Sequence, residues 1–245
     1  MRYIDLNKIL VHRHTWGNRQ ELWRDPKLVE DFRNYGYNKC WYTEVELAGH
    51  DPHIDHWRPK AEVLPYKGYK YNEPLRYLGY HWLANNPENY RLSCICANRK
   101  TGEGGKGRYF PLSDSSACLT PNGQEIEDPL LLDPCDKNDV KLVSFLGSDV
   151  IAATKDPLKQ EKVRVSAEIY NMIDSHIKKK RRAVWDEIEQ TIKEFEEEEI
   201  SKKACIRKLT KAVDRMSEFS ACAIACINSL APDEIKDELG PLLDL

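Results

Sequence analysis

The chain has 245 residues, of which 41% are hydrophobic and 31% are charged, so it can bury a core without needing a disulfide or a metal to fold. This composition argues against disorder over the whole length. The formal net charge of −3 argues against a generally basic nucleic-acid-binding protein. Any contact with nucleic acid is therefore expected from local patches or from a partner.

The amino-terminal residues and the cysteines indicate the cellular compartment. Charged residues follow Met1 closely, where a signal peptide would have an apolar core, and the apolar stretches of the sequence are too short to span a bilayer. The chain has eight cysteines but is neither small nor visibly secreted, so they are expected to be reduced thiols. We expect a cytoplasmic protein with no membrane partner.

Two regions of different composition make up the first part of the chain. Residues 1–36 are predicted to be a helical segment, in which Asp25-Pro26 is typical of an N-cap and first-turn proline and the helix ends near Gly36. From residue 51 to about 133, Pro, Gly, Asn, His and aromatic residues are concentrated and helical periodicity is weak. Short strands and long loops are predicted there, within a second region that covers residues 37–150.

The last region, residues 151–245, is predicted to be mainly helical. Asp156-Pro157 is a second capped start, and apolar residues then recur at helical spacing over 165–195. A further helix is expected to carry Ile206, Leu209, Val213 and Met216 and to run into the stretch 219–227. Because that stretch is apolar on every side, we expect it to be buried in this chain's own bundle or covered by another chain.

Three short stretches, 53–60, 89–94 and 96–100, gather the residues that can do chemistry. They supply a carboxylate and an amide oxygen for a hard divalent ion, an imidazole that takes a proton near neutral pH, and cations for phosphate. Neighbouring residues of a strand point to opposite faces, so Asp55 can face a metal while His56 faces a water. Asn98 is expected near the start of a short helix, close enough to complete the protein ligands.

These stretches carry a resemblance to a known family. Asp55-His56, then Asn89-x-x-Leu-x-Cys, then Asn98-Arg99-Lys100 resemble the HNH motif of nucleases in its form with asparagine at the third position. The segments 55–60, 80–84, 109–112 and 131–135 resemble more narrowly the PtuB-like branch, the nuclease subunits of Septu and retron-associated antiphage defence. The resemblance covers roughly residues 37–135. It implies an α+β fold with a small ββα-metal core embedded among helices.

The resemblance also implies roles for individual residues. His56 matches the general base, and Asn89 matches the asparagine that orders the loop and orients the base. Asp55 and Asn98 match the ligands of one Mg²⁺ or Mn²⁺ ion, which would stabilise the charge that develops when a water activated by His56 attacks phosphorus. The candidates for contacts to phosphate are Arg58, Lys60, Arg99 and Lys100.

The implied setting is the cytoplasm of a bacterium. There the chain would cleave DNA as the effector of an antiphage complex with an ABC-type ATPase of the PtuA kind. A retron reverse transcriptase with its RNA and DNA is a further implied partner. Two alternatives stay open: an RNA-cleaving nuclease, for example one that attacks tRNA, and a non-catalytic assembly subunit that keeps the HNH scaffold.

The sequence departs from the family at two places. Many members hold the fold with zinc between two Cys-x-x-Cys pairs, but here Thr43 and Ala97 stand where the second cysteines would be. A zinc site would need another combination, made of Cys40, Cys94 and Cys96 with a fourth ligand such as Cys118 or Cys135. A glycine-rich insertion, residues 101–108, follows the third part of the motif and is interpreted as a mobile loop near the substrate.

Overall fold

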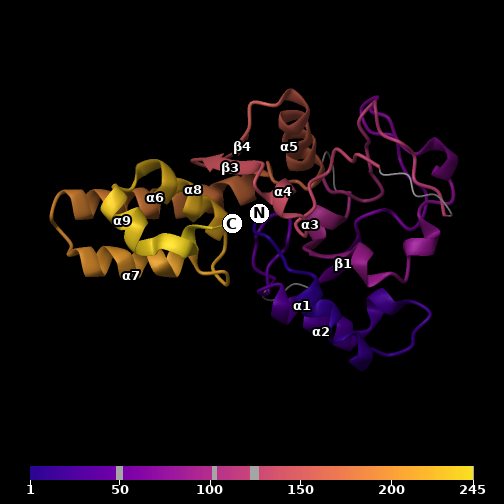
Figure 1. The fold of residues 1–245 in the computed structure, drawn as a ribbon, viewed down its shortest axis with the longest axis horizontal. Helices are drawn as coiled ribbons and strands as arrows, with labels where there is room; N and C mark the ends of the chain where they lie inside the picture. Colours follow the sequence, from indigo (N-terminus) through magenta and orange to yellow (C-terminus); the bar gives the residue numbers. More distant parts are fainter. Residues whose placement is uncertain (48–51, 101–103, 122–126, 245) are drawn as a thin grey trace.

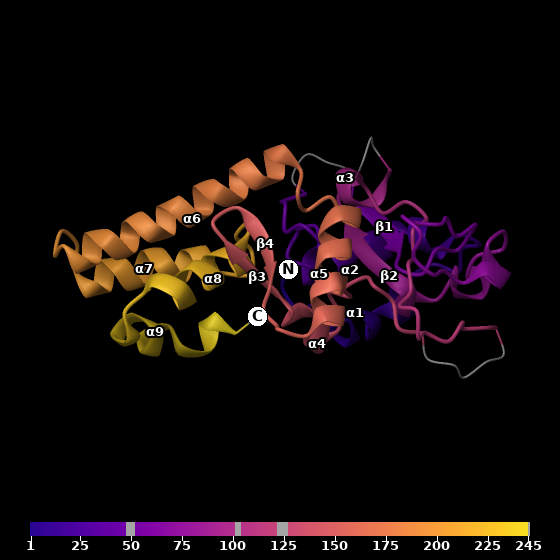
Figure 2. The same ribbon diagram turned by 90° about the horizontal axis from the view of Figure 1, so that it is seen from above.

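The structure is a computed structural model that describes residues 1–47, 52–100, 104–121 and 127–244. In this part of the chain, helices are combined with two small antiparallel sheets (Figure 1). Helices α6 to α9 form one end of the molecule, and α1, α2 and the first sheet lie at the other, with α5 and a hairpin between them (Figure 2). The prediction of an α+β fold is confirmed at this level.

The amino-terminal segment contains α1 (Asn7–Leu10), two 3-10 turns (Arg13–Thr15 and Leu22–Arg24) and α2 (Pro26–Tyr35). The Asp25 carboxylate caps α2, since it accepts hydrogen bonds of 3.0 Å from the backbone nitrogens of Lys27 and Leu28. Proline in the first turn loses no hydrogen bond there. The helix stops before Gly36, as the sequence predicts.

The first sheet pairs β1 (His53–His56) with β2 (Tyr90–Ser93), and His56 lies opposite Tyr90. Three 3-10 turns, Glu73–Leu75, His81–Leu83 and Pro87–Asn89, interrupt the long connection between the strands. Helix α3 (Ile95–Asn98) follows β2 directly. The expectation of short strands and long loops is confirmed. Asn98, however, ends α3 and does not start it, because the helix is a single turn and Arg99 is already extended.

A hairpin joins the two ends of the molecule. After the short helix α4 (Lys137–Val140), β3 (Val143–Leu146) pairs with β4 (Asp149–Ala152) through a tight turn at Gly147, whose φ is 59°. Strand β3 packs on α8, and β4 packs on α5 (Pro157–Ile169). The boundary predicted from the sequence, between residues 150 and 151, falls inside β4. The regions 37–150 and 151–245 therefore meet in a hairpin and not in a linker.

The carboxy-terminal helices are α6 (Ser175–Glu196), α7 (Lys202–Val213), α8 (Ser220–Leu230) and α9 (Asp233–Leu239), followed by the 3-10 turn Gly240–Leu243. The prediction of one helix running from 206 into 219–227 is wrong. The chain leaves α7 after Val213, and Phe219 takes a left-handed φ of 53° before α8 begins. Residues 220–227 are all buried, and α8 packs against α6, α7 and β3, so the apolar stretch is covered within this chain.

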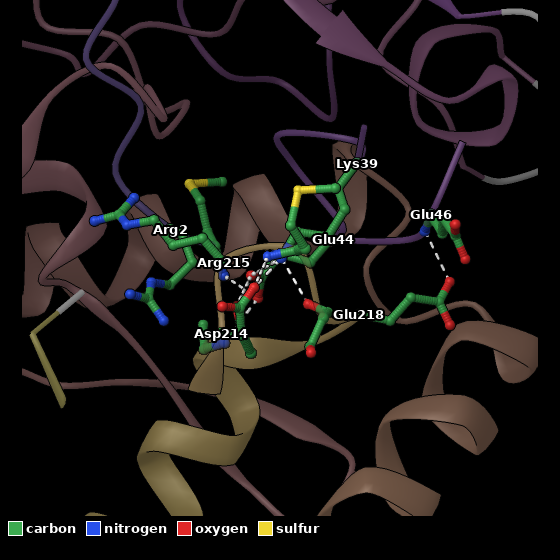
Figure 3. A network of polar contacts seen from close by, with 12 residues as sticks. Arg2, Lys39, Glu44, Glu46, Asp214, Arg215 and Glu218 are labelled. Carbon is green, nitrogen blue, oxygen red and sulfur yellow. Dashed lines mark hydrogen bonds and ion pairs between the residues drawn. The ribbon is translucent and has the colours of Figure 1, made fainter. Parts of the chain in front are cut away.

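A buried ion-pair network holds the amino-terminal part against α8 (Figure 3). At its centre, Glu44 accepts hydrogen bonds from the Met1 amino group (3.3 Å), Lys39 (3.4 Å) and Ser220 (3.1 Å). Burial alone would raise the pKa of Glu44, but the surrounding cations of Met1, Lys39 and Arg2 outweigh it and lower the pKa to about 2. The Glu44 carboxylate is therefore charged and bridges distant parts of the chain.

Candidate functional site

A cleft of about 530 Å³ opens beside β1. Its walls come from the 3-10 turn before α2, from β1 and the turn after it, from the end of α3 and from residues 107–108. The polar, charged and aromatic residues that line it include Trp23, Arg24, His53, Asp55, His56, Lys60, Asn98, Arg99 and Arg108. The fold thus brings Asp55, His56 and Asn98 to one cleft.

His56 is buried and held in one tautomer. Its Nε2 lies 3.0 Å from the carbonyl oxygen of Ala84. Because a carbonyl can only accept, Nε2 carries the hydrogen and Nδ1 keeps a free lone pair. The rings of Trp23 and Tyr90 pack edge-on against the imidazole, with centroid distances of 4.9 and 5.1 Å. Burial lowers the pKa of His56 to about 4, so the imidazole is neutral near pH 7 with its Nδ1 lone pair available, and it is a weaker base than an exposed imidazole.

Asp55 is engaged on both carboxylate oxygens. Oδ2 accepts a 2.6 Å hydrogen bond from the Tyr42 hydroxyl, and Oδ1 accepts one of 3.1 Å from the Lys106 ammonium. Lys106 also donates to the backbone carbonyl of His56 over 2.7 Å. The exposed fraction of the side chain is 4% for Asp55 and 0% for Lys106. Burial lowers the pKa of Lys106, and Asp55 opposes this shift.

The position of Lys106 corrects the interpretation of residues 101–108 as a mobile loop. Residues 101–103 lie outside the described residues. The backbone nitrogen of Lys106, however, donates to the Ala97 carbonyl over 2.8 Å, and that of Gly107 donates to Asn98 over 2.7 Å. The two backbone hydrogen bonds fix this part of the segment to α3, and the buried ion pair with Asp55 fixes it to β1.

The cleft offers oxygen ligands of the type that magnesium prefers, the carboxylate of Asp55 and the amide of Asn98. Their arrangement does not form a ready metal site, because Lys106 already neutralises Asp55. Among the described residues, no group of three or more His, Cys, Asp or Glu side chains is placed to hold a metal ion. The requirement for Mg²⁺ or Mn²⁺ stays a prediction.

Asn89 lies outside the cleft and fixes the turn that follows β1. Its side chain accepts from the backbone nitrogen of Arg58 (2.8 Å) and donates to the Arg58 carbonyl (2.9 Å). Its own carbonyl accepts from the Trp57 nitrogen at 2.8 Å. Asn89 is thus placed to hold the backbone next to His56, which is the ordering role that the resemblance implies, and it does not line the cleft.

The four predicted phosphate contacts separate into two groups. Lys60 and Arg99 line the cleft, and the Lys60 ammonium lies 3.1 Å from the centre of the Trp23 ring. Arg58 and Lys100 do not line it. The Arg58 guanidinium donates to the buried Glu127 carboxylate (2.9 Å), because that carboxylate needs a counter-charge. Lys100 lines a neighbouring pocket.

Sequence reasoning missed several residues of the cleft. Trp23 and Arg24 come from a part of the chain with no recognisable motif, and Arg108 pairs with Glu62 at 2.7 Å. Lys106, which pairs with Asp55 but does not itself line the cleft, was also missed; the available signal was a single lysine between two glycines in the sequence. Such a lysine can lie close to the backbone of neighbouring elements, because glycine permits a close approach.

The candidate zinc ligands Cys40, Cys94 and Cys96 lie near one another, but among the residues that the structure describes they do not form part of a metal-binding group. The sulfurs of Cys94 and Cys96 are 3.0 Å apart. The Cys40 sulfur lies 3.9 Å from the hydroxyl of Ser93, which is the last residue of β2 and directly precedes Cys94. All eight cysteines are free thiols, as predicted. Since no group of three or more His, Cys, Asp or Glu side chains among the described residues could hold a metal ion, the zinc site gains no support.

The fold and the cleft define an α+β protein with a neutral histidine and several cations in one cleft. No family model matches the sequence. The chain is similar to the Septu protein PtuB of Bacillus mycoides (strain KBAB4), with 27% identity over 172 residues, which are 69% of this chain and 54% of that protein. The chain therefore spans about half the length of this relative. The similarity supports the predicted PtuB-like relationship.

The sequence predicts that no segment of the chain spans a membrane. Of the helices in the described ranges, none combines the length and the apolar character needed to cross a bilayer.

Proposed function

We propose that the chain is an HNH-type endonuclease that hydrolyses phosphodiester bonds of DNA in the cytoplasm as part of antiphage defence. The observation that carries this proposal is the neutral His56 imidazole with a free Nδ1, in the same cleft as Asn98 and the cations Lys60 and Arg99. The similarity to the Septu protein PtuB supports the defence role and a PtuA-type ATPase as partner. The retron partners are implied by the resemblance alone.

The proposed reaction uses the lone pair on Nδ1 of His56. It takes a proton from a water molecule, the resulting hydroxide attacks phosphorus, and the bond from phosphorus to the 3′ oxygen breaks. The 3′ oxygen takes a proton from water, so the products carry a 5′-phosphate and a 3′-hydroxyl. Lys60 and Arg99 bind neighbouring phosphates without sequence preference. Mg²⁺ or Mn²⁺ is the cofactor expected from the resemblance; Asp55 and Asn98 would hold it, and it would stabilise the charge that develops on the phosphate.

The test uses the chain co-expressed with its genomic neighbours and purified with the proposed PtuA-type ATPase. Plasmid DNA and a matched RNA are incubated with the complex and Mg²⁺, and the wild type is compared with His56→Ala. The variant is expected to lose about 10²- to 10⁴-fold in cleavage rate, which is the contribution of a general base. His176→Ala, an exposed position on α6, is the control. Equal cleavage by the wild type and His56→Ala refutes the proposal, and cleavage of RNA alone changes its substrate.

One observation favours the assembly subunit as a second candidate function. Asp55 is a predicted metal ligand, yet both of its carboxylate oxygens accept hydrogen bonds from within the chain. An assembly subunit would bind the ATPase and cleave neither DNA nor RNA at any concentration of Mg²⁺. Copurification combined with the cleavage assay separates the two functions.

A further inference from the structure

We propose that Lys106 is the built-in counter-cation of Asp55, and that a divalent metal ion reaches Asp55 by taking the place of the Lys106 ammonium. The inference rests on the proposed function, because it concerns the cation which that function expects. It makes Lys106 a positioning residue that sets the metal affinity of the cleft.

The burial of Lys106 is the first observation behind this inference. A lysine ammonium is strongly hydrated, so full burial is costly unless fixed acceptors replace the water. Lys106 has 0% exposure, and its acceptors are Asp55 Oδ1 at 3.1 Å and the His56 carbonyl at 2.7 Å. An ammonium in this position cannot contact a phosphate in the cleft. Its contacts instead neutralise the carboxylate and hold the end of β1.

The backbone around Lys106 is built to insert this side chain. Gly105 has a φ of +94°, and a Cβ atom there would lie 1.8 Å from the Arg99 carbonyl oxygen. Only glycine allows this close approach. The neighbouring nitrogens of Lys106 and Gly107 donate to the carbonyls of Ala97 and Asn98. The loop that delivers the ammonium is therefore tied to the same helix end that carries Asn98.

Charge repulsion makes the ammonium and a metal ion competitors for Asp55. Two cations at one buried carboxylate repel strongly, because the interior screens charge less than water does. The Lys106 backbone is fixed, so the exchange requires a movement of its flexible four-carbon side chain alone. Tyr42 can keep its hydrogen bond to Oδ2 during this exchange, since it holds the other oxygen. The Lys106 ammonium thus stays paired with the Asp55 carboxylate until a divalent cation displaces it.

The test measures binding of Mn²⁺ alone by calorimetry, together with thermal unfolding, for the wild type and Lys106→Met. The variant leaves Asp55 without its counter-ion, so it is expected to unfold at a lower temperature without metal and to regain stability as Mn²⁺ is added. Its affinity for Mn²⁺ is expected to rise about tenfold or more. Lys106→Gln keeps a donor for the His56 carbonyl without the charge, and should bind Mn²⁺ more tightly with a smaller loss of stability.

Two controls define the site. Lys67→Met removes an exposed lysine that pairs with Glu168 outside the cleft, and should leave Mn²⁺ binding unchanged. The double variant Asp55→Asn with Lys106→Met removes both charges and should lose the gain in affinity. These controls separate an effect at Asp55 from a general change of charge.

Several results overturn the inference. The inference fails if both Lys106 variants bind Mn²⁺ no more tightly than the wild type does. It also fails if none of the proteins binds Mn²⁺, or if both variants fail to fold at every Mn²⁺ concentration. If the wild type cleaves DNA while the variants show no gain, the inference fails and the proposed function stands. If the variants gain affinity but neither DNA nor RNA is cleaved, the proposed function fails and the inference stands.

Discussion

The pKa of His56 predicts that the stability of the protein depends on pH in a defined window. Burial lowers this pKa from 6.5 to about 4. Between these values the unfolded chain binds a proton that the folded imidazole does not, so the free energy of unfolding falls as the pH is lowered through the window. One pKa unit corresponds to ~1.4 kcal/mol, so the difference between 6.5 and about 4 amounts to ~3 kcal/mol. Above pH 6.5 both states are neutral and His56 adds no pH dependence.

The assay is urea unfolding from about pH 7 to about pH 4, for the wild type and His56→Gln. Glutamine does not titrate in this range and can still donate to the Ala84 carbonyl. The contributions of other groups cancel in the difference between the two proteins. The stability of the wild type relative to the variant should therefore fall by ~3 kcal/mol across the window.

A stability difference that stays constant within about 0.5 kcal/mol refutes the reasoning, because it means that the folded imidazole titrates like the unfolded one. The exposed His176→Gln variant is the control for histidine content. In the cleavage assay, the same shift predicts that kcat/KM decreases on the acid side near the pKa of about 4, and not near 6.5.

Predictions for four further variants concern other parts of the structure. Asp25→Ala removes the cap of α2 and should reduce the free energy of unfolding by about 1 kcal/mol in urea unfolding. Gly105→Ala forces a side chain against the Arg99 carbonyl and should destabilise by about 1–3 kcal/mol or more, measured in the same way. Arg99→Ala should lower the slope of log affinity for DNA against log salt by about 1. Arg58→Ala, which loses the pair with Glu127, should reduce stability and leave that slope unchanged.

Local sequence signals predicted the elements whose cause is local. The N-cap residues Asp25 and Asp156 directly precede the helices that they stabilise, and both helices begin where the sequence predicts. The break between α7 and α8 was missed because apolar spacing continues through it, although residues 214–219 are not helical and the backbone of Phe219 is left-handed. Spacing reports which residues are apolar and does not report where the backbone turns.

The residues of the cleft also divide into those that local sequence signals predicted and those that they did not. The motif order was enough to predict that Asp55, His56 and Asn98 share a cleft, because strand pairing and one helical turn bring them together. The partners of these residues could not be predicted in this way. The Ala84 carbonyl, which sets the tautomer of His56, and the Lys106 ammonium, which engages Asp55, are contacts that exist only after long loops have packed.

The β3–β4 hairpin has a consequence for how this protein can be divided. One strand rests on the helical end and the other on α5, so the pairing crosses the border between the halves. Cutting the chain after residue 150 would split β4 and would leave β3 and α8, which pack on each other, in different fragments. The two halves are therefore not interchangeable modules: a recombination point at this border would separate parts that need each other to fold.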